Sequence, residues 1–194
     1  MKIIVIGATG TLGSAVARQL EHRGHEVVRA ARRGPVRVDL TDRASVDALF
    51  ASVGDVDAVI CCAASGRLTP LDSPSDEEFT TGLQGKLLGQ VHLVRHALPH
   101  LRDGGVIVLT SGVFEQPTPG GAFGALVNAG LDAFVRAAAI EMPRGLRLAV
   151  VSPGWVAETL TGMGLDPSDG TPAAEVARAY VAHLNARAPD GRRR

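Results

Sequence analysis

The sequence predicts a doubly wound α/β fold of the Rossmann type, in which a parallel sheet carries helices on both faces. Short runs of β-branched and other apolar residues alternate along the chain with stretches of helical periodicity. These short runs are apolar throughout, which is typical of strands covered on both faces. The first run, at residues 3–6, ends directly in a glycine-rich turn that opens a helix.

Six of the apolar runs are predicted to be strands, and a seventh strand stays open as an alternative. The strands are expected at residues 3–6, 26–30, 36–38, 56–61, 106–109 and 146–151. Helices are expected at 11–23, from Thr41 or Asp42 to 53, from Ser75 or Asp76 to about 101, at 122–141 and at 172–186. This β-then-α order favours a parallel sheet with right-handed crossovers. The chain of 194 residues shows no domain-sized linker, so residues 1–194 are expected to form one domain.

Composition excludes several classes of function. Twenty basic and twenty acidic residues give no net charge, so no nucleic-acid partner is expected. Cys61 and Cys62 are adjacent, which suits neither an ordinary disulfide nor a metal site. Met1 and Lys2 lead straight into the first strand, and no apolar stretch of membrane-spanning length lacks charges or breaks. A cytoplasmic protein without a membrane partner is expected.

The turn after the first strand has the features of a dinucleotide site. It reads Gly7-Ala8-Thr9-Gly10-Thr11-Leu12-Gly13 and runs directly into the first predicted helix. Gly7 permits the tight turn, Gly10 lets the backbone approach a pyrophosphate, and Gly13 lets the helix pack closely on the sheet. The helix start also offers free N–H donors and a partial positive charge. The alternative is a tight turn that binds nothing.

The end of the second strand favours NADP(H) over NAD(H). An acidic residue commonly stands there to bind the ribose 2′-hydroxyl. Here the strand ends in Ala30-Ala31 and is followed by Arg32 and Arg33. Two guanidinium groups can hold a 2′-phosphate through paired hydrogen bonds. The alternative is that both arginines are solvated loop residues.

With these motifs, the chain resembles the short-chain dehydrogenase/reductase superfamily over nearly its whole length. Asp39-Leu40 resembles the contact with the adenine ring, and Cys61-Cys62-Ala63-Ala64 stands where the family usually has Asn-Asn-Ala-Gly. Ser111 matches the active-site serine, and Pro153-Gly154-Trp155-Val156 resembles the loop that holds the nicotinamide carboxamide. The turn, the arginines and the resemblance together imply the following cofactor-binding residues: Gly7, Thr9, Gly10, Thr11, Leu12, Gly13, Arg32, Arg33, Asp39, Leu40, Cys62, Ala63, Ala64, Pro153 and Val156.

The catalytic residues depart from the family pattern. The resemblance places Gly124 at the position of the family's general acid Tyr and Asn128 at that of its Lys. The position of the family's active-site Asn is taken by Lys86, three residues before Gly89. Lys and Asn are therefore expected to be exchanged between two adjoining helices. The alternative for Lys86 is an exposed helix residue.

These residues predict an NADP(H)-dependent oxidoreductase that acts on a small carbonyl or alcohol substrate with an atypical active site. The expected catalytic residues are Ser111, Lys86 and Asn128, with Ser111 polarising the carbonyl and Lys86 stabilising the alkoxide or donating a proton. Without the Tyr, two alternatives stay open: a non-redox isomerase, dehydratase or cyclase, and an NADP(H)-binding sensor or partner protein. The apolar segment 157–171 favours a small or flat, weakly polar substrate or an open site covered by a neighbour, with a structural cap as the competing interpretation.

Two further features concern metals and assembly. His92, His96 and His100 recur every four residues, but no carboxylate or Cys partner accompanies them, so no metal is expected. We prefer the interpretation that these three histidines form a surface or subunit-contact face. Members of the family commonly pair through two long helices, here 77–101 and 122–141, which implies a homodimer.

Overall fold

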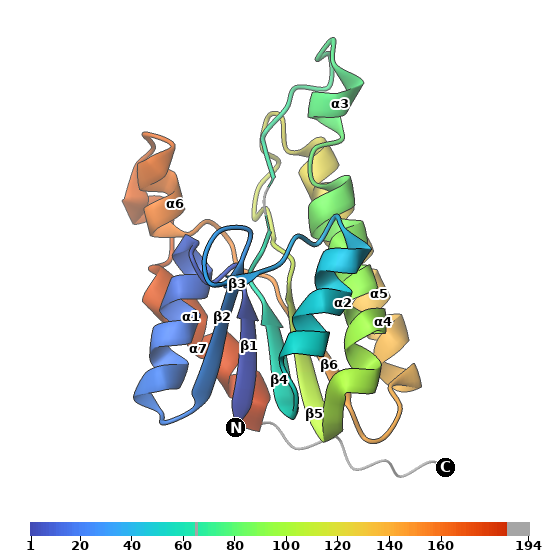
Figure 1. Ribbon diagram of the computed structural model, residues 1–194. Helices are drawn as coiled ribbons and strands as arrows, with labels where there is room; N and C mark the ends of the chain where they lie inside the picture. The colour runs from blue at the N-terminus through green and yellow to red at the C-terminus, as the bar shows by residue number, and fades with distance from the viewer. Residues whose placement is uncertain (65, 186–194) are drawn as a thin grey trace, which may run out of the picture.

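A parallel sheet of six strands lies at the centre of the computed structural model, which describes residues 1–64 and 66–185 (Figure 1). The strands are β1 (Lys2–Ile6), β2 (Glu26–Ala31), β3 (Val36–Arg37), β4 (Val56–Cys61), β5 (Leu101–Thr110) and β6 (Arg147–Val151). Their spatial order is β3-β2-β1-β4-β5-β6, and every neighbouring pair is parallel. The order reverses between β1 and β4, where ligands of doubly wound sheets bind. The predicted fold class is confirmed.

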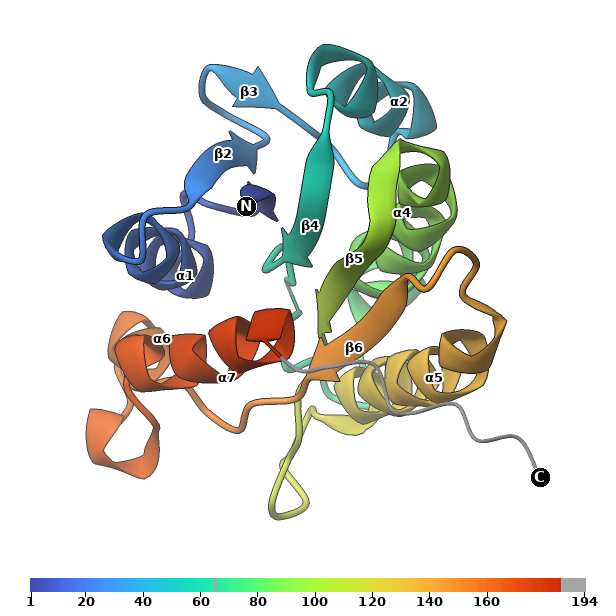
Figure 2. The same cartoon turned by 90° about the horizontal axis from the view of Figure 1, so that it is seen from below.

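Helices cover both faces of the sheet (Figures 1 and 2). On one face lie α1 (Thr11–His22) and α7 (Ala173–Asn185); on the other lie α2 (Arg43–Ser52), α4 (Gly89–Ala97) and α5 (Ala122–Ala138). Each face has its own buried apolar cluster, and neighbouring residues of β1 alternate between them, with Ile3 in one and Ile4 in the other. Because both clusters exclude water, β1 is apolar along its buried length.

The single helix expected from Ser75 or Asp76 to about Leu101 was wrong. The structure has α3 (Asp76–Phe79), a π-helical turn η1 (Leu83–Leu88), α4 and a short 3-10 turn η2 (Leu98–His100). Gly82 breaks the helix because it adopts the left-handed φ of 103°. Its carbonyl accepts from the N–H of Leu87, five residues later, which widens the next turn.

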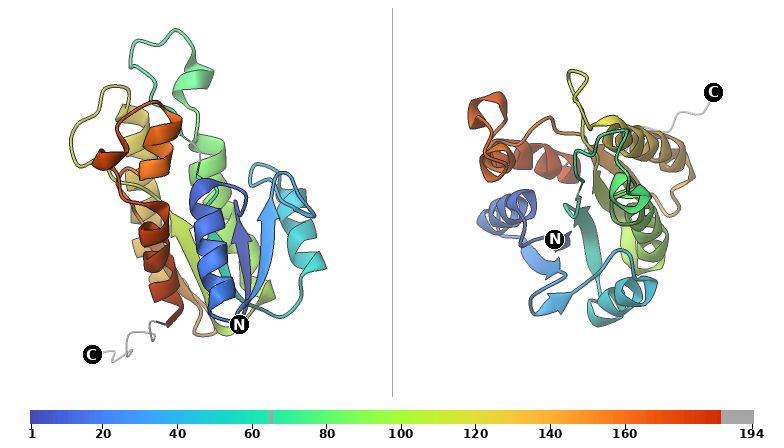
Figure 3. Two further views of the ribbon diagram at one scale, coloured as in Figure 1. Left: turned by 90° about the vertical axis from the view of Figure 1, so that its left-hand side faces the viewer. Right: turned by 90° about the horizontal axis from the view of Figure 1, so that it is seen from above.

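The second half of the chain also differs in detail from the expected elements. β5 begins at Leu101, five residues before the predicted start, and α5 ends in a 3-10 turn, η3 (Ala139–Glu141). The apolar segment 157–171 contains α6 (Ala157–Gly162) and a 3-10 turn, η4 (Pro167–Asp169). The last residue of the predicted final helix, Ala186, lies outside the described residues. Both α3 and α6 project beyond the carboxyl ends of the strands, on opposite sides of the sheet (Figures 1 and 3).

The segment Ala122–Glu141, which comprises α5 and η3, is apolar along much of its length. In residues 1–64 and 66–185 it is the one helix with the length and hydropathy of a membrane span, which is weak evidence because core helices of soluble proteins pass the same test. It carries charged residues at Asp132, Arg136 and Glu141. Its outer side exposes Leu126 and Ile140, which are 62% and 89% accessible.

A buried polar network joins both helical layers to the end of β5. Gln90 on α4 is fully buried. Its Nε2 donates to the backbone carbonyls of Lys86 (2.8 Å) and Thr110 (2.9 Å). Its Oε1 accepts from the backbone N–H of Thr110 (2.9 Å). The Thr110 hydroxyl lies 2.8 Å from the Tyr180 hydroxyl on α7. Through Gln90, the network therefore fixes the backbone of Lys86 relative to that of Thr110, the strand residue before Ser111.

Replacing Gln90 with Met is expected to lower the free energy of unfolding by about 2–4 kcal/mol, because two buried backbone groups of Thr110 lose their partner. Urea denaturation followed by circular dichroism measures this loss. The matched control is Gln84→Met, an exposed residue of η1, which should change stability by less than about 0.5 kcal/mol. Equal effects of the two substitutions would contradict the role given to the network.

Candidate active site

Two cavities lie along the carboxyl edge of the sheet, with volumes of about 680 Å³ beside β2 and about 660 Å³ beside β5 and α5. Gly10, Cys62 and Ala64 line both, so the cavities form one continuous groove. It crosses the point where the strand order reverses. The predicted site residues that line it are Gly7, Thr9, Gly10, Thr11, Leu12, Arg32, Arg33, Asp39, Leu40, Cys62, Ala63, Ala64, Lys86, Ser111, Asn128, Pro153 and Val156.

Gly13, the remaining predicted cofactor residue, packs inside the turn. A Cβ on Gly13 would lie 2.1 Å from the carbonyl oxygen of Gly7, so only glycine lets α1 approach the sheet. Gly7 has a left-handed φ of 80°, and a Cβ there would lie 2.7 Å from the nitrogen of Ala63. The start of α1 at Gly10 has no side-chain cap and no acidic residue in its first turn. Its free N–H groups face the groove and fit a pyrophosphate.

The first cavity is bordered by two free guanidinium groups. Arg32 and Arg33 are exposed, and within the described ranges neither forms an ion pair. The Asp39 carboxylate is fixed because it accepts from the N–H (2.9 Å) and the hydroxyl (2.8 Å) of Thr41. These two hydrogen bonds lower the pKa of Asp39, and the charge of Arg32 lowers it further. The cavity therefore offers a carboxylate held in a fixed position and two guanidinium groups without an ion pair among the described residues.

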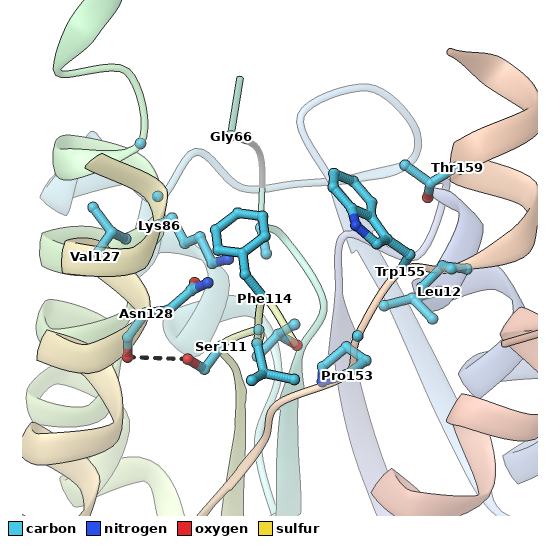
Figure 4. Close-up of a pocket in the computed structure, with 18 of the residues that line it drawn as sticks. Leu12, Gly66, Lys86, Ser111, Phe114, Val127, Asn128, Pro153, Trp155 and Thr159 are labelled. Atoms are coloured by element: carbon cyan, nitrogen blue, oxygen red, sulfur yellow. Dashed lines mark hydrogen bonds between the residues drawn. The ribbon is translucent and has the colours of Figure 1, made fainter. Parts of the chain in front are cut away.

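The second cavity brings together the three predicted catalytic residues from separate elements (Figure 4). Ser111, directly after β5, is buried, and its hydroxyl donates to the backbone carbonyl of Asn128 on α5 (3.1 Å). Asn128 is buried, with a relative accessibility of 8%, and its Oδ1 has no hydrogen-bond partner among the described atoms. Lys86 reaches into the same cavity from η1. Lys86 is partly buried, so the alternative of an exposed helix residue was wrong.

Burial of Lys86 lowers the pKa of its amine to about 8, although the negative charge of Asp132 on α5 acts in the opposite direction. In the part of the chain that the structure describes, Lys86 forms no ion pair. The amine is therefore close to half protonated near pH 8 and can act as a proton donor or, when neutral, as a base or nucleophile.

Phe114 is a cavity residue that sequence reasoning missed. Its ring lies against Gly124, where an added Cβ would be 3.3 Å from the ring carbon Cε2, and against Gly121. The ring of Trp155 meets it edge-on at a centroid distance of 5.9 Å. Phe114 thus occupies space next to Gly124, which the family resemblance aligns with the Tyr of the family. The glycines spaced by three at the start of α5 were the available signal, because they leave a flat surface on that side of the helix.

The three histidines lie at the surface beside α2. His92 lies 3.4 Å from Arg43, His96 pairs with Asp47 at 2.5 Å, and His100 stacks on Phe50 at 5.1 Å. Within residues 1–64 and 66–185 there is no group of three side chains able to hold a metal. The four-residue spacing therefore places all three side chains against α2, and their use as a subunit-contact face stays a prediction.

The pKa of Lys86 can be measured directly, because the chain contains only two lysines, Lys2 and Lys86. In protein carrying ¹³C-labelled lysine, the Lys86 side chain is expected to titrate with a midpoint near pH 8. A Lys86→Arg variant identifies its NMR signal. A midpoint near the ordinary value of 10.5 would show that the cavity does not desolvate the amine.

Comparison with known proteins agrees with this fold. The family model for enoyl-(acyl carrier protein) reductase matches residues 7–184. The solved structure of the protein lin1944 from Listeria innocua is 38% identical, with a TM-score of 0.88 over 97% of this chain and 96% of the other. A small-chain dehydrogenase solved in complex with NADPH has a TM-score of 0.83 at 24% identity, over 96% of this chain and 91% of the other. A 3-oxoacyl-[acyl-carrier-protein] reductase of Haemophilus influenzae is 27% identical, over 81% of this chain and 75% of its own length. The chain belongs to the short-chain dehydrogenase/reductase superfamily.

Proposed function

We propose that the protein is an NADP(H)-dependent oxidoreductase that acts on a small carbonyl or alcohol substrate. The observation that carries this proposal is the convergence of Lys86, Ser111 and Asn128 at one end of a groove whose other end has the features of a nucleotide site. Arg32 and Arg33 suit the 2′-phosphate that distinguishes NADP(H) from NAD(H). The NADPH-bound dehydrogenase with the same fold supports this choice.

The proposed chemistry assigns each polar group in the second cavity a role. When bound, the nicotinamide supplies or accepts the hydride. The Ser111 hydroxyl, which now donates to a backbone carbonyl, can rotate to donate to the substrate oxygen. The Lys86 ammonium stabilises the developing alkoxide and donates the proton that the family takes from Tyr. The Oδ1 of Asn128 has no partner among the described atoms, so it can accept from the ammonium and hold it toward the substrate.

The walls of the cavity indicate the kind of substrate. Phe114, Trp155, Val113 and Met163 line it with aromatic and aliphatic surface. Such walls favour a flat, weakly polar carbonyl compound that buries its apolar part. The reductase from Haemophilus influenzae supports carbonyl chemistry on this fold.

A second candidate is favoured by Gly124, which leaves the site without a phenol. A bound nucleotide together with a single titratable amine also suits an isomerase, dehydratase or cyclase, or a protein that senses NADP(H). The two candidates differ in one observable, because only the oxidoreductase consumes the nucleotide in proportion to product.

Replacing Arg32 with Ala is expected to weaken NADPH binding by about tenfold to a hundredfold, because one charge-assisted hydrogen bond commonly contributes that much to affinity. NADH has no 2′-phosphate, so its affinity should stay unchanged. Fluorescence titration of both nucleotides measures the difference, with Arg37→Ala as the control because Arg37 is exposed on β3 outside both cavities. Equal affinity of the wild type for the two nucleotides would argue against the assignment of the arginines.

Replacing Lys86 with Met is expected to lower kcat for NADPH-dependent reduction of an aromatic aldehyde by about 10²–10⁴, the usual contribution of a general acid. Because the ammonium is the donor, the wild-type rate should be highest below pH 8 and fall as the pH rises through the pKa of about 8. Steady-state kinetics at several pH values tests both statements. Full activity of the Lys86→Met variant, or a wild-type rate that rises as the pH passes 8, would contradict a role of Lys86 in the reaction.

We further propose a homodimer that uses the exposed side of α5. Ala122, Leu126, Ala129, Ala133 and Ala137 are exposed along one side of this helix, and small residues let two helices approach closely. Leu126→Arg is expected to turn the dimer into a monomer in sedimentation velocity. Leu71→Arg is the matched control, because Leu71 is 79% exposed but lies outside this face. A wild-type protein that sediments as a monomer at all concentrations contradicts the proposal.

A further inference from the structure

The two lysines of the chain lie in contrasting places. The sequence has twenty Lys and Arg residues, of which only Lys2 and Lys86 are lysines. Lys2 lies at the amino end of β1 and pairs with Glu26 at 3.5 Å. Lys86 lines the cavity at the carboxyl edge. An arginine stays protonated at any pH that a protein tolerates, whereas a lysine can lose its proton and become a nucleophile. The amine at position 86 therefore brings a reactivity that the arginines elsewhere in the chain lack.

The surroundings of Lys86 suit an amine that reacts in its neutral form. The apolar side chains of Phe114 and Val127 line the same cavity, and Figure 4 shows Lys86 reaching into it from η1. No carboxylate among the described residues pairs with the amine. A lysine desolvated in an apolar pocket is the usual form of a nucleophilic lysine.

Asn128 supplies a second, independent sign of a ligand in this cavity. The residue is only 8% accessible, and its buried Oδ1 lacks a partner among the described atoms. A buried acceptor without a partner is unfavourable, and such a group in a native structure commonly has a partner in a bound ligand or water. Placed on the same cavity as Lys86, it can accept from the N–H or O–H of an adduct formed on the amine.

We infer that Lys86 captures small apolar aldehydes as a covalent, reversible imine. The neutral amine adds to the carbonyl carbon, the nitrogen gives up a proton and the carbonyl oxygen takes one up, which yields a carbinolamine. This intermediate loses its hydroxyl together with the remaining proton of the nitrogen as water, while the C=N bond forms. The balance is amine plus aldehyde giving imine plus water, so no oxidant or reductant is required. The buried Oδ1 of Asn128 holds the carbinolamine through a hydrogen bond.

This inference uses the amine assigned under the proposed function, but in its other protonation state and without any nucleotide. The charged and titratable groups around the amine are Asp132 on α5, Arg67 on the loop after β4 and the Cys62 thiol, whose pKa is raised by burial. Imine formation should increase as the pH rises through about 8, whereas reduction should decrease. The opposite directions separate the two activities.

The test is reductive trapping with benzaldehyde and sodium cyanoborohydride at pH 8, without nucleotide, followed by peptide mass spectrometry. A Lys2→Arg variant keeps the charge that faces Glu26 and leaves Lys86 as the one lysine, so the reactive amines are that of Lys86 and the chain's α-amine. At this pH about half of an amine with a pKa of 8 is neutral, against about one in 300 for a pKa of 10.5. The benzyl adduct is therefore expected on Lys86, forming roughly a hundredfold faster in the folded protein than in urea.

Two further variants make the result specific. Lys86→Arg should abolish the internal adduct and leave only the label on the α-amine. Asn128→Ala should slow trapping at Lys86 by about tenfold, the value of one hydrogen bond of about 1.4 kcal/mol, while the NMR titration of Lys86 shows whether its pKa has moved. Trapping on the α-amine alone, or equal rates in the folded and unfolded chains, would overturn the inference.

Measurements on the same samples distinguish a failure of this inference from a failure of the proposed function. A protein that binds and oxidises NADPH but is not trapped at Lys86 retains the proposed function and loses the imine. A protein that is trapped at Lys86 but binds no nucleotide retains the imine and loses the proposed function.

Discussion

The turn between β1 and α1 has no room for a side chain at two of its positions. A Cβ on Gly13 would meet the carbonyl of Gly7 at 2.1 Å, and a Cβ on Gly7 would meet the backbone of Ala63 at 2.7 Å. These close approaches bring the start of α1 and the end of β4 to the same edge of the sheet. The groove with its free amides and both its cavities depends on this contact.

At the far end of the groove, an amine and an amide face one cavity, because Lys86 and Asn128 both line it. The family resemblance predicts that these two residues are the Lys and the Asn of the family in exchanged positions. Lys86 lies on a π-helical turn between glycines, in apolar surroundings that lower its pKa, and the Oδ1 of Asn128 has no partner among the described atoms. The cavity therefore combines an amine that titrates near neutral pH with a buried acceptor that a ligand can reach.

The sequence predicted the fold more completely than the site. The alternation of apolar strands and helices was sufficient for the fold class, and the glycine turn marked one end of the groove, because both signals are local. The break at Gly82 was missed, because an isolated glycine is tolerated inside a helix and periodicity does not report the left-handed φ that Gly82 adopts. Lys86 and Asn128 could be named only by comparison with a family pattern. Their burial depends on how η1 and α5 pack around the cavity, and the place of Phe114 depends on the loop after β5, neither of which periodicity reports.

The ring of Phe114 also constrains how this chain can change. It packs against Gly124, which the family resemblance aligns with the Tyr of the family. A tyrosine introduced there alone would meet the ring, and a small residue introduced at 114 alone would leave an empty space beside Trp155. Residues 114 and 124 are therefore expected to change together, because either substitution alone first lowers the stability of the protein.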